Sequence, residues 1–262
     1  MFKPSCLLLP LALALTAAAL HAATPGADPA FFRLLDVLHG EADEASAVPP
    51  GEGAKPARLI GAAAKAEPFF AQATARRQAG DAVGAREILH QVLALPRLDS
   101  RRALRAWKGL RDLGETPDGP AAGQVLGVVV EFDYEVEGEH AILTVASYPD
   151  GDPVLAASSG YSLLGARLLA RTVVTGRSLV TAAQPLLAEI PAGEDRKLPG
   201  NGQIRFTLLT PGGPHTRELA RRELESDPAT SQHPLRPLYI AAQQLLAALR
   251  LESERLEDGR RP

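Results

Sequence analysis

The chain has 262 residues, 45% of them hydrophobic, and its 28 basic and 31 acidic side chains give a formal net charge of −3. This slightly acidic balance excludes the Lys- and Arg-rich composition typical of nucleic-acid-binding proteins, so we expect no nucleic-acid partner. Cys6 is the sole cysteine, which excludes intrachain disulfides and means that a packed core has to stabilise the fold.

Residues 1–22 have the pattern of a cleavable secretory signal peptide. Lys3 precedes an apolar run over residues 7–20, and small residues follow it. We expect cleavage after Ala22, which also removes Cys6 and leaves no cysteine for lipid attachment. The alternative is an uncleaved membrane anchor, for which about 20 apolar residues are needed. We therefore expect a periplasmic or secreted mature chain that does not span the membrane.

Residues 23–57 are expected to hold a first helix followed by a linker. The helix is predicted over 28–44, with Asp28 as its N-cap and Pro29 in its first turn. Residues 45–57 have the Pro and Gly density of an irregular connection. The apolar face of the helix consists of Phe31, Leu34, Leu35 and Leu38.

Residues 58–114 have a helical period throughout. Apolar spacing and the stops at glycine and proline predict helices over 67–79, 82–94 and 99–113. Residues 69–96 resemble one tetratricopeptide unit, whose small residues let two antiparallel helices pack closely. No second copy follows at the roughly 34-residue offset of that repeat. We interpret the region as a single helical hairpin packed on the rest of the protein, and a peptide-binding groove is the alternative.

The period changes after a Pro- and Gly-rich linker over residues 115–122. Apolar and polar residues alternate over 128–136, so this strand should bury one face. Turn residues then separate three further candidate strands, over 141–148, 153–157 and 161–166. The sequence therefore predicts an antiparallel meander.

Residues 123–252 are expected to form an α+β domain in which helices cover an antiparallel sheet, and residues 253–262 a frayed tail. After the meander, the expected elements are a helix over 167–189 that a proline interrupts, a strand over 203–209, a short helix over 217–225 and a long helix over 234–252.

The apolar side of these strands needs helices to cover it, which predicts a core shared by the sheet and the C-terminal helix. Its expected members are Val128, Val130, Phe132, Leu143, Val145, Phe206, Leu208, Leu245 and Leu249.

Several short segments resemble an uncharacterised bacterial protein family in which a helical hairpin precedes a strand of the type Leu-Gly-Val-Val-Val-Glu, here residues 126–131. The resemblance continues through a hairpin at Tyr148, Asp150 and Gly151, a Ser-Gly turn at residues 159–160, and a segment Phe-x-x-Leu-Thr-Pro-x-Gly over 206–213. It spans about residues 70–250 and implies no known activity.

Candidate catalytic chemistry rests on Ser158 or Ser159, with His140 as base and Asp133 to orient it. Neither serine lies in a Gly-x-Ser-x-Gly elbow, and a serine beside Gly160 is typical of a turn. We therefore predict no catalytic residue. The histidines are scattered along the chain, so we predict no metal ligand and no bound cofactor.

Charge is segregated along the chain. Residues 76–111 hold nine Arg or Lys against three acids, whereas residues 112–166 hold ten acids and no Arg or Lys. For Glu131, Asp133 and Glu135 we favour a solvated strand face. The alternatives are docking of the basic helices, a partner surface, and Ca²⁺ binding. The basic block is interpreted as a solvated helix face or as a site for anionic ligands.

These features predict an exported, non-catalytic binding or accessory protein of the bacterial envelope, with another envelope protein as its possible partner. The alternative is a small periplasmic serine hydrolase that uses Ser159 with His140.

Overall fold

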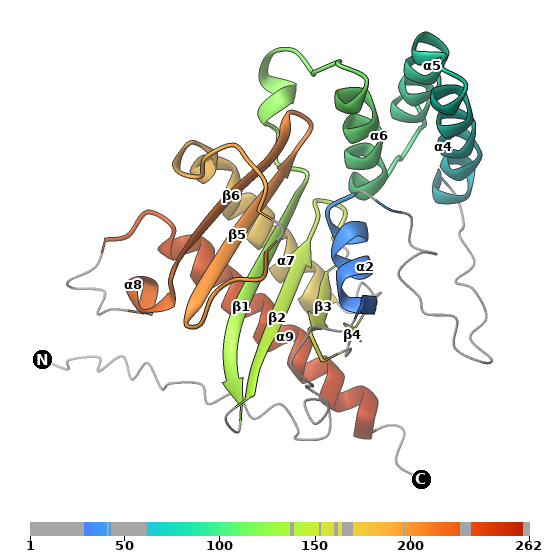
Figure 1. Cartoon of the computed structure of the whole chain (residues 1–262). Coiled ribbons are helices and arrows are strands. Elements are labelled where there is room, and N and C mark those ends of the chain that lie inside the picture. The colour runs from blue at the N-terminus through green and yellow to red at the C-terminus, as the bar shows by residue number, and fades with distance from the viewer. Residues whose placement is uncertain are drawn as a thin grey trace, which may run out of the picture.

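The computed structural model describes residues 29–40, 42, 62–136, 139–151, 153–159, 162–163, 170–195, 197–225 and 232–258. Over these residues the chain has the expected α+β fold, in which a helical unit precedes an antiparallel sheet that further helices cover (Figure 1). The expected signal peptide and the linker over residues 45–57 lie outside the described residues. Within the described part of the chain, no helix has both the length and the apolar character needed to cross a membrane.

The helices are α2 (Pro29–Leu38), α4 (Ala62–Gln78), α5 (Ala82–Leu93), α6 (Ser100–Asp112), α7 (Ala170–Ala183), α8 (Arg221–Glu225) and α9 (Arg236–Asp258), with short 3₁₀ helices η1 (Gly119–Gly123) and η3 (Gln184–Glu189). The strands are β1 (Gly127–Val136), β2 (Glu139–Ser147), β3 (Val154–Ala157), β4 (Ser162–Leu163), β5 (Gln203–Thr210) and β6 (Gly213–Ala220).

The helical unit consists of α4, α5 and α6, as predicted. Asp81 begins α5 because its carboxylate accepts a hydrogen bond from the N–H of Gly84, and Asp99 caps α6 in the same way through the N–H of Arg102. These three helices share a core of their own. Its buried members are Ala66, Phe70, Ala73, Leu89, Val92, Ala106 and Leu110.

The described strands form one antiparallel sheet in the order β4-β3-β2-β1-β5-β6. Strands β1 to β4 form the predicted meander, while β5 joins the other side of β1. The register pairs Val130 of β1 with Val145 of β2 and with Phe206 of β5. Since successive side chains point to opposite faces, this register places the apolar residues of the central strands on one face together.

Strand β6 corrects the sequence-based expectation of a helix over 217–225. Residues 213–220 pair with β5 along its whole length, and only Arg221–Glu225 is helical. Leu219 fills the core opposite Ile204, so the sheet pairing outweighs the helical composition of this segment. On its outer side the first half of β6 is covered, because Gly193 N–H donates to Pro214 O and Thr216 N–H donates to Pro191 O, each at 2.9 Å.

Two helix ends also differ from the sequence-based ranges. Helix α2 ends at Leu38 instead of near residue 44, because the chain turns at Gly40 with φ of +73°, where a Cβ would lie 2.9 Å from Leu104 Cβ. Helix α9 continues to Asp258, so residues 253–258 are helical rather than frayed. The break predicted within 167–189 is confirmed, since α7 ends at Ala183 and η3 follows.

The two faces of the sheet have different coverings. Helices α7 and α9 lie behind the strands in Figure 1 and bury the predicted core, all of whose expected members pack together. On the other face, α2 and Leu104 of α6 cover an apolar half around Val129, Ala146 and Tyr148. The remaining half of that face is polar, and Asp195, Lys197 and Gly200 contact it.

Candidate functional site

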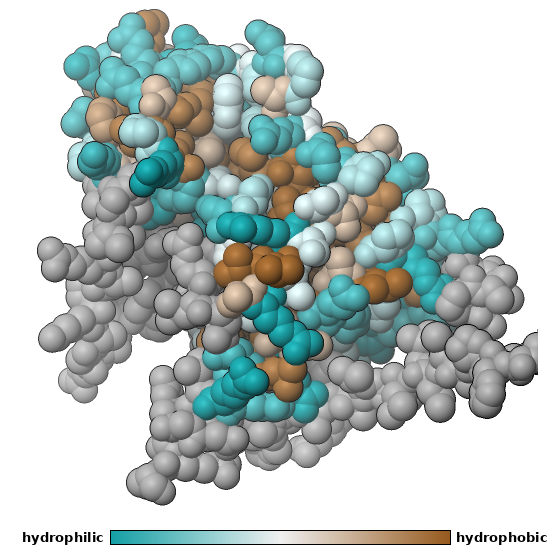
Figure 2. Space-filling view, turned by 180° about the vertical axis from the view of Figure 1, so that it is seen from behind, coloured by the Kyte–Doolittle hydropathy of each residue, from teal (hydrophilic) through white to brown (hydrophobic). Residues whose placement is uncertain are grey.

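A groove of about 200 Å³ lies between α4, α5 and α6. Helices α4 and α6 each pack against α5 but scarcely against each other, so α5 forms the floor. Gly109 lets α6 approach α5 closely, since a Cβ there would lie 2.8 Å from Leu89 Cδ1. Phe70, Ala73 and Leu89 supply apolar lining. Seen from behind in Figure 2, the helical unit has apolar surface among hydrophilic side chains.

The rim of this groove is positively charged. Lys108 Nζ lies 2.9 Å from Asp112 Oδ2, and Arg77 Nη1 lies 3.8 Å from the same oxygen. Arg105 Nη1 donates to Glu67 Oε2 over 2.9 Å. These three rim cations therefore share two carboxylates, and one of the two, Glu67, also pairs with Arg102. The side chains of Arg77 and Asp112 are 53% and 40% exposed. An anionic group in the solvent can reach this rim.

Two further cavities in the described part of the chain are much smaller. One, of about 20 Å³, lies where α2 and α6 meet the sheet, and the other, of about 10 Å³, lies beside Arg101 and Arg102. Each has room for about one water molecule. A ligand of useful size therefore fits the groove and neither of these cavities.

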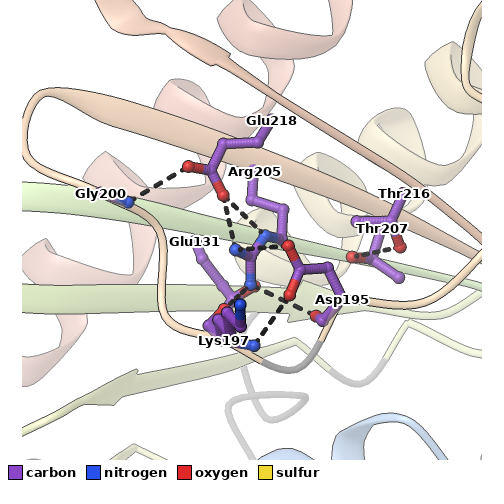
Figure 3. A network of polar contacts seen from close by, with 8 residues as sticks. All are labelled: Glu131, Asp195, Lys197, Gly200, Arg205, Thr207, Thr216 and Glu218. Carbon is purple, nitrogen blue, oxygen red and sulfur yellow. Dashed lines mark hydrogen bonds and ion pairs between the residues drawn. The ribbon is translucent and has the colours of Figure 1, made fainter.

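The polar half of the sheet contains a buried ionic network centred on Arg205 (Figure 3). The Arg205 side chain is only 2% exposed and contacts the carboxylates of Glu131, Asp195 and Glu218. Its guanidinium also donates to the carbonyl of Lys197. This arrangement holds Asp195 and Lys197 against β1, β5 and β6.

The network corrects the interpretation of the acidic strand face as solvated. Glu131 and Asp133 are each only 4% exposed. Asp133 Oδ2 accepts a hydrogen bond from the N–H of Gly202 at 2.7 Å, and its Oδ1 lies 3.3 Å from Nδ1 of His140. The side chain of Glu135 lies outside the described part of the structure. The described carboxylates are therefore engaged in internal contacts, which disfavours the Ca²⁺ interpretation.

The candidate catalytic residues are only partly brought together. Nδ1 of His140 contacts Asp133, in the way that a catalytic base contacts the carboxylate that orients it. The other ring nitrogen, Nε2, lies 3.2 Å from the amide nitrogen of Asn201. Ser158 Oγ accepts a hydrogen bond from the N–H of Ile142 at 3.0 Å. The hydroxyl and the imidazole are thus engaged separately, and their contacts do not build a nucleophile.

No metal centre is evident in the described ranges, where no group of three or more His, Cys, Asp or Glu could hold an ion. Among the residues that the structure describes, no donor set indicates a particular cofactor.

The basic block meets the sheet at Tyr148, Pro211 and Asp150. Arg101 lies over the ring of Tyr148, with 5.3 Å between the guanidinium carbon and the ring centroid. Arg111 donates to the carbonyl of Pro211, and the N–H of Ser100 donates to Asp150 at 3.1 Å. The ion pair of Glu131 is with Arg205 of β5, a partner that the sequence did not predict.

Comparison with other proteins adds no assignment: no family model matches the chain, and no curated protein or solved structure is similar to it. The groove, the ionic network around Arg205 and the contact between Asp133 and His140 are therefore interpreted from their own chemistry.

Proposed function

We propose that the mature chain is an exported, non-catalytic accessory protein of the bacterial envelope, which binds another protein in the α4–α6 groove. The observation that carries this proposal is a groove of about 200 Å³ with apolar lining and a cationic rim. Apolar lining gives a binding site affinity, and a few placed charges orient the ligand. The export part rests on the signal-peptide pattern of residues 1–22.

A pair of matched substitutions tests the binding site. Thr74 lines the groove, whereas Gln72, on the same helix and also exposed, does not. An envelope protein is first captured by pull-down with the mature chain and purified. Thr74→Trp should fill the groove and lower the affinity for that protein, measured by calorimetry. Gln72→Trp should leave affinity unchanged. Equal binding by both variants would place the interface elsewhere.

Export is tested separately by expression with residues 1–22 in place. We expect a periplasmic product whose N-terminal sequence begins at Ala23 or within a few residues of it. Recovery of the full-length chain only in the membrane fraction would instead support the uncleaved anchor.

The rival proposal is a small periplasmic serine hydrolase, and the contact between Asp133 and His140 is the observation that favours it. Catalysis would require the hydroxyl of Ser158 to break its hydrogen bond with the N–H of Ile142, or Ser159 to supply the nucleophile. We expect no labelling of the folded chain by a fluorophosphonate probe. Labelling that is lost in His140→Ala would replace the binding proposal with the hydrolase.

A further inference from the structure

We infer that the groove takes a segment of the partner that carries both carboxylates and apolar side chains, and that a partner carboxylate displaces Asp112 from Lys108 and Arg77. This inference rests on the proposed function, because it names the chemistry of the ligand at the same site.

The apolar requirement follows from the lining. Phe70 and Ala73 of α4 and Leu89 of α5 are buried members of the helical core whose surfaces also border the groove. The guanidinium of Arg105 lies 4.0 Å from the centroid of the Phe70 ring. This stacking fixes a cation directly above the apolar lining. A ligand with neighbouring apolar and acidic side chains matches that juxtaposition.

The acidic requirement follows from the balance of charge at the rim. Arg105 is held by Glu67, whereas Lys108 and Arg77 both face the single carboxylate of Asp112. Asp112 therefore occupies the position that a ligand carboxylate would take. It is 40% exposed, so it can turn into solvent when a competing carboxylate arrives.

This competition predicts effects of opposite sign for two residues in direct contact. Lys108→Gln removes an attractive charge and should weaken binding of an acidic ligand. Asp112→Asn removes the internal competitor and should strengthen it. Asp112 is the last residue of α6, where a negative charge is unfavourable to the helix dipole, so this change should not destabilise the helix.

The test uses the mature chain and a short fluorescent peptide of alternating glutamate and leucine, with affinity measured by fluorescence anisotropy. A second peptide has glutamine in place of glutamate. We expect binding of the first peptide to weaken about fivefold in Lys108→Gln and to tighten about fivefold in Asp112→Asn, each about 1 kcal/mol. Lys65→Gln, on the exposed side of α4 and outside the groove lining, is the matched control and should change nothing.

Three results would overturn the inference. Equal binding of the two peptides, or no effect of Asp112→Asn, would show that no ligand carboxylate competes at this rim. The groove proposal would still stand if Thr74→Trp abolished binding of the native partner. No binding of either peptide would reject this ligand chemistry in the same way. Equal affinity of Thr74→Trp and Gln72→Trp for the native partner would reject the groove as the binding site.

Discussion

Arg205 is the residue on which the polar half of the sheet depends. A guanidinium taken out of water loses much of its hydration, and here carboxylates from β1, from β6 and from residues 193–200 replace it. Glu218 and Asp195 keep partial access to solvent, whereas the Glu131 side chain is only 5% exposed. Of the three carboxylates, Glu131 has the least solvation by water and therefore depends most on Arg205 for the stabilisation of its charge.

Removal of this cation should strongly destabilise the fold. Arg205→Met removes the cation that contacts the buried carboxylate of Glu131, and breaking a buried pair in this way costs about 3–5 kcal/mol. Urea denaturation should show a correspondingly lower midpoint. The double variant Arg205→Met with Glu131→Met should lose less, since neither buried charge then remains.

Arg217 provides the matched control, because it lies on the adjacent strand β6 but is exposed. Arg217→Met should change the free energy of unfolding by no more than about 0.5 kcal/mol. An unchanged urea midpoint in Arg205→Met would mean that the network contributes nothing to stability.

Tyr239 makes the stability of the fold sensitive to alkaline pH. Burial, together with the hydrogen bond that its hydroxyl donates to Glu225, raises the pKa of this phenol above its ordinary value of 10. The folded state therefore keeps a proton that the unfolded state releases, so stability present below pH 10 should fall as pH rises further. Tyr239→Phe should flatten this fall in urea midpoint. An equally steep fall in the variant would assign the pH dependence to other groups.

At the scale of elements, α7 lies very close to the sheet at Gly176. A Cβ at this position would lie 2.5 Å from Oγ of Ser147 on β2. That hydroxyl is buried and has no hydrogen-bond partner among the described residues. The absence of a side chain at residue 176 therefore sets how deeply α7 sits on the strands.

This contact predicts a change of sign in a double-mutant cycle. Gly176→Ala alone should destabilise by about 1–3 kcal/mol through overpacking. In a Ser147→Ala background the clash is gone, and the same change should stabilise by up to about 1 kcal/mol because alanine favours the helix. Thermal denaturation of the four proteins measures the cycle. Additive effects would show that Gly176 and Ser147 do not limit the packing.

The elements that the sequence predicted well are those in which one local pattern decides the structure. The alternation from Val128 to Phe132 identified both the strand and its buried side, and all expected core members pack together. The same alternation placed Glu131 and Asp133 on the opposite side. It could not show that this side is covered, because the covering residues come from a distant part of the chain and Arg205 lies on another strand.

The groove was predictable only in part. Helical periodicity gave α4, α5 and α6, and the charge count gave the basic block. Arg77 and Lys108 share the carboxylate of Asp112. This contact depends on how α4 and α6 are oriented on α5, which no local sequence pattern encodes. Strand β6 was missed for a related reason, since its pairing with β5 is a tertiary preference that outweighs local composition.

At the scale of the whole molecule, α6 belongs to two cores. Ala106 and Leu110 pack within the helical unit, whereas Leu104 packs with α2 on the sheet. The helical unit and the α+β part are thus joined by a continuous helix with apolar contacts on both sides.

This junction predicts one cooperative unfolding transition. Trp107, the sole tryptophan, packs against the core of the helical unit, so its fluorescence should follow the same urea curve as far-ultraviolet circular dichroism of the whole chain. Added NaCl should shift the midpoint little, since exposed ion pairs contribute only about 0–1 kcal/mol each. An earlier transition of Trp107 would show that the helical unit unfolds on its own.

The segment that covers the outer edge of β6 has a consequence for self-association. A strand at the end of a sheet offers unpaired N–H and C=O groups, and identical chains can add to one another there and polymerise. Over the first half of β6 these groups are already hydrogen-bonded to Pro191 and Gly193. A second copy that approached this edge would have to peel away residues 191–193 first, so the chain carries its own protection against filament growth at that end of the sheet.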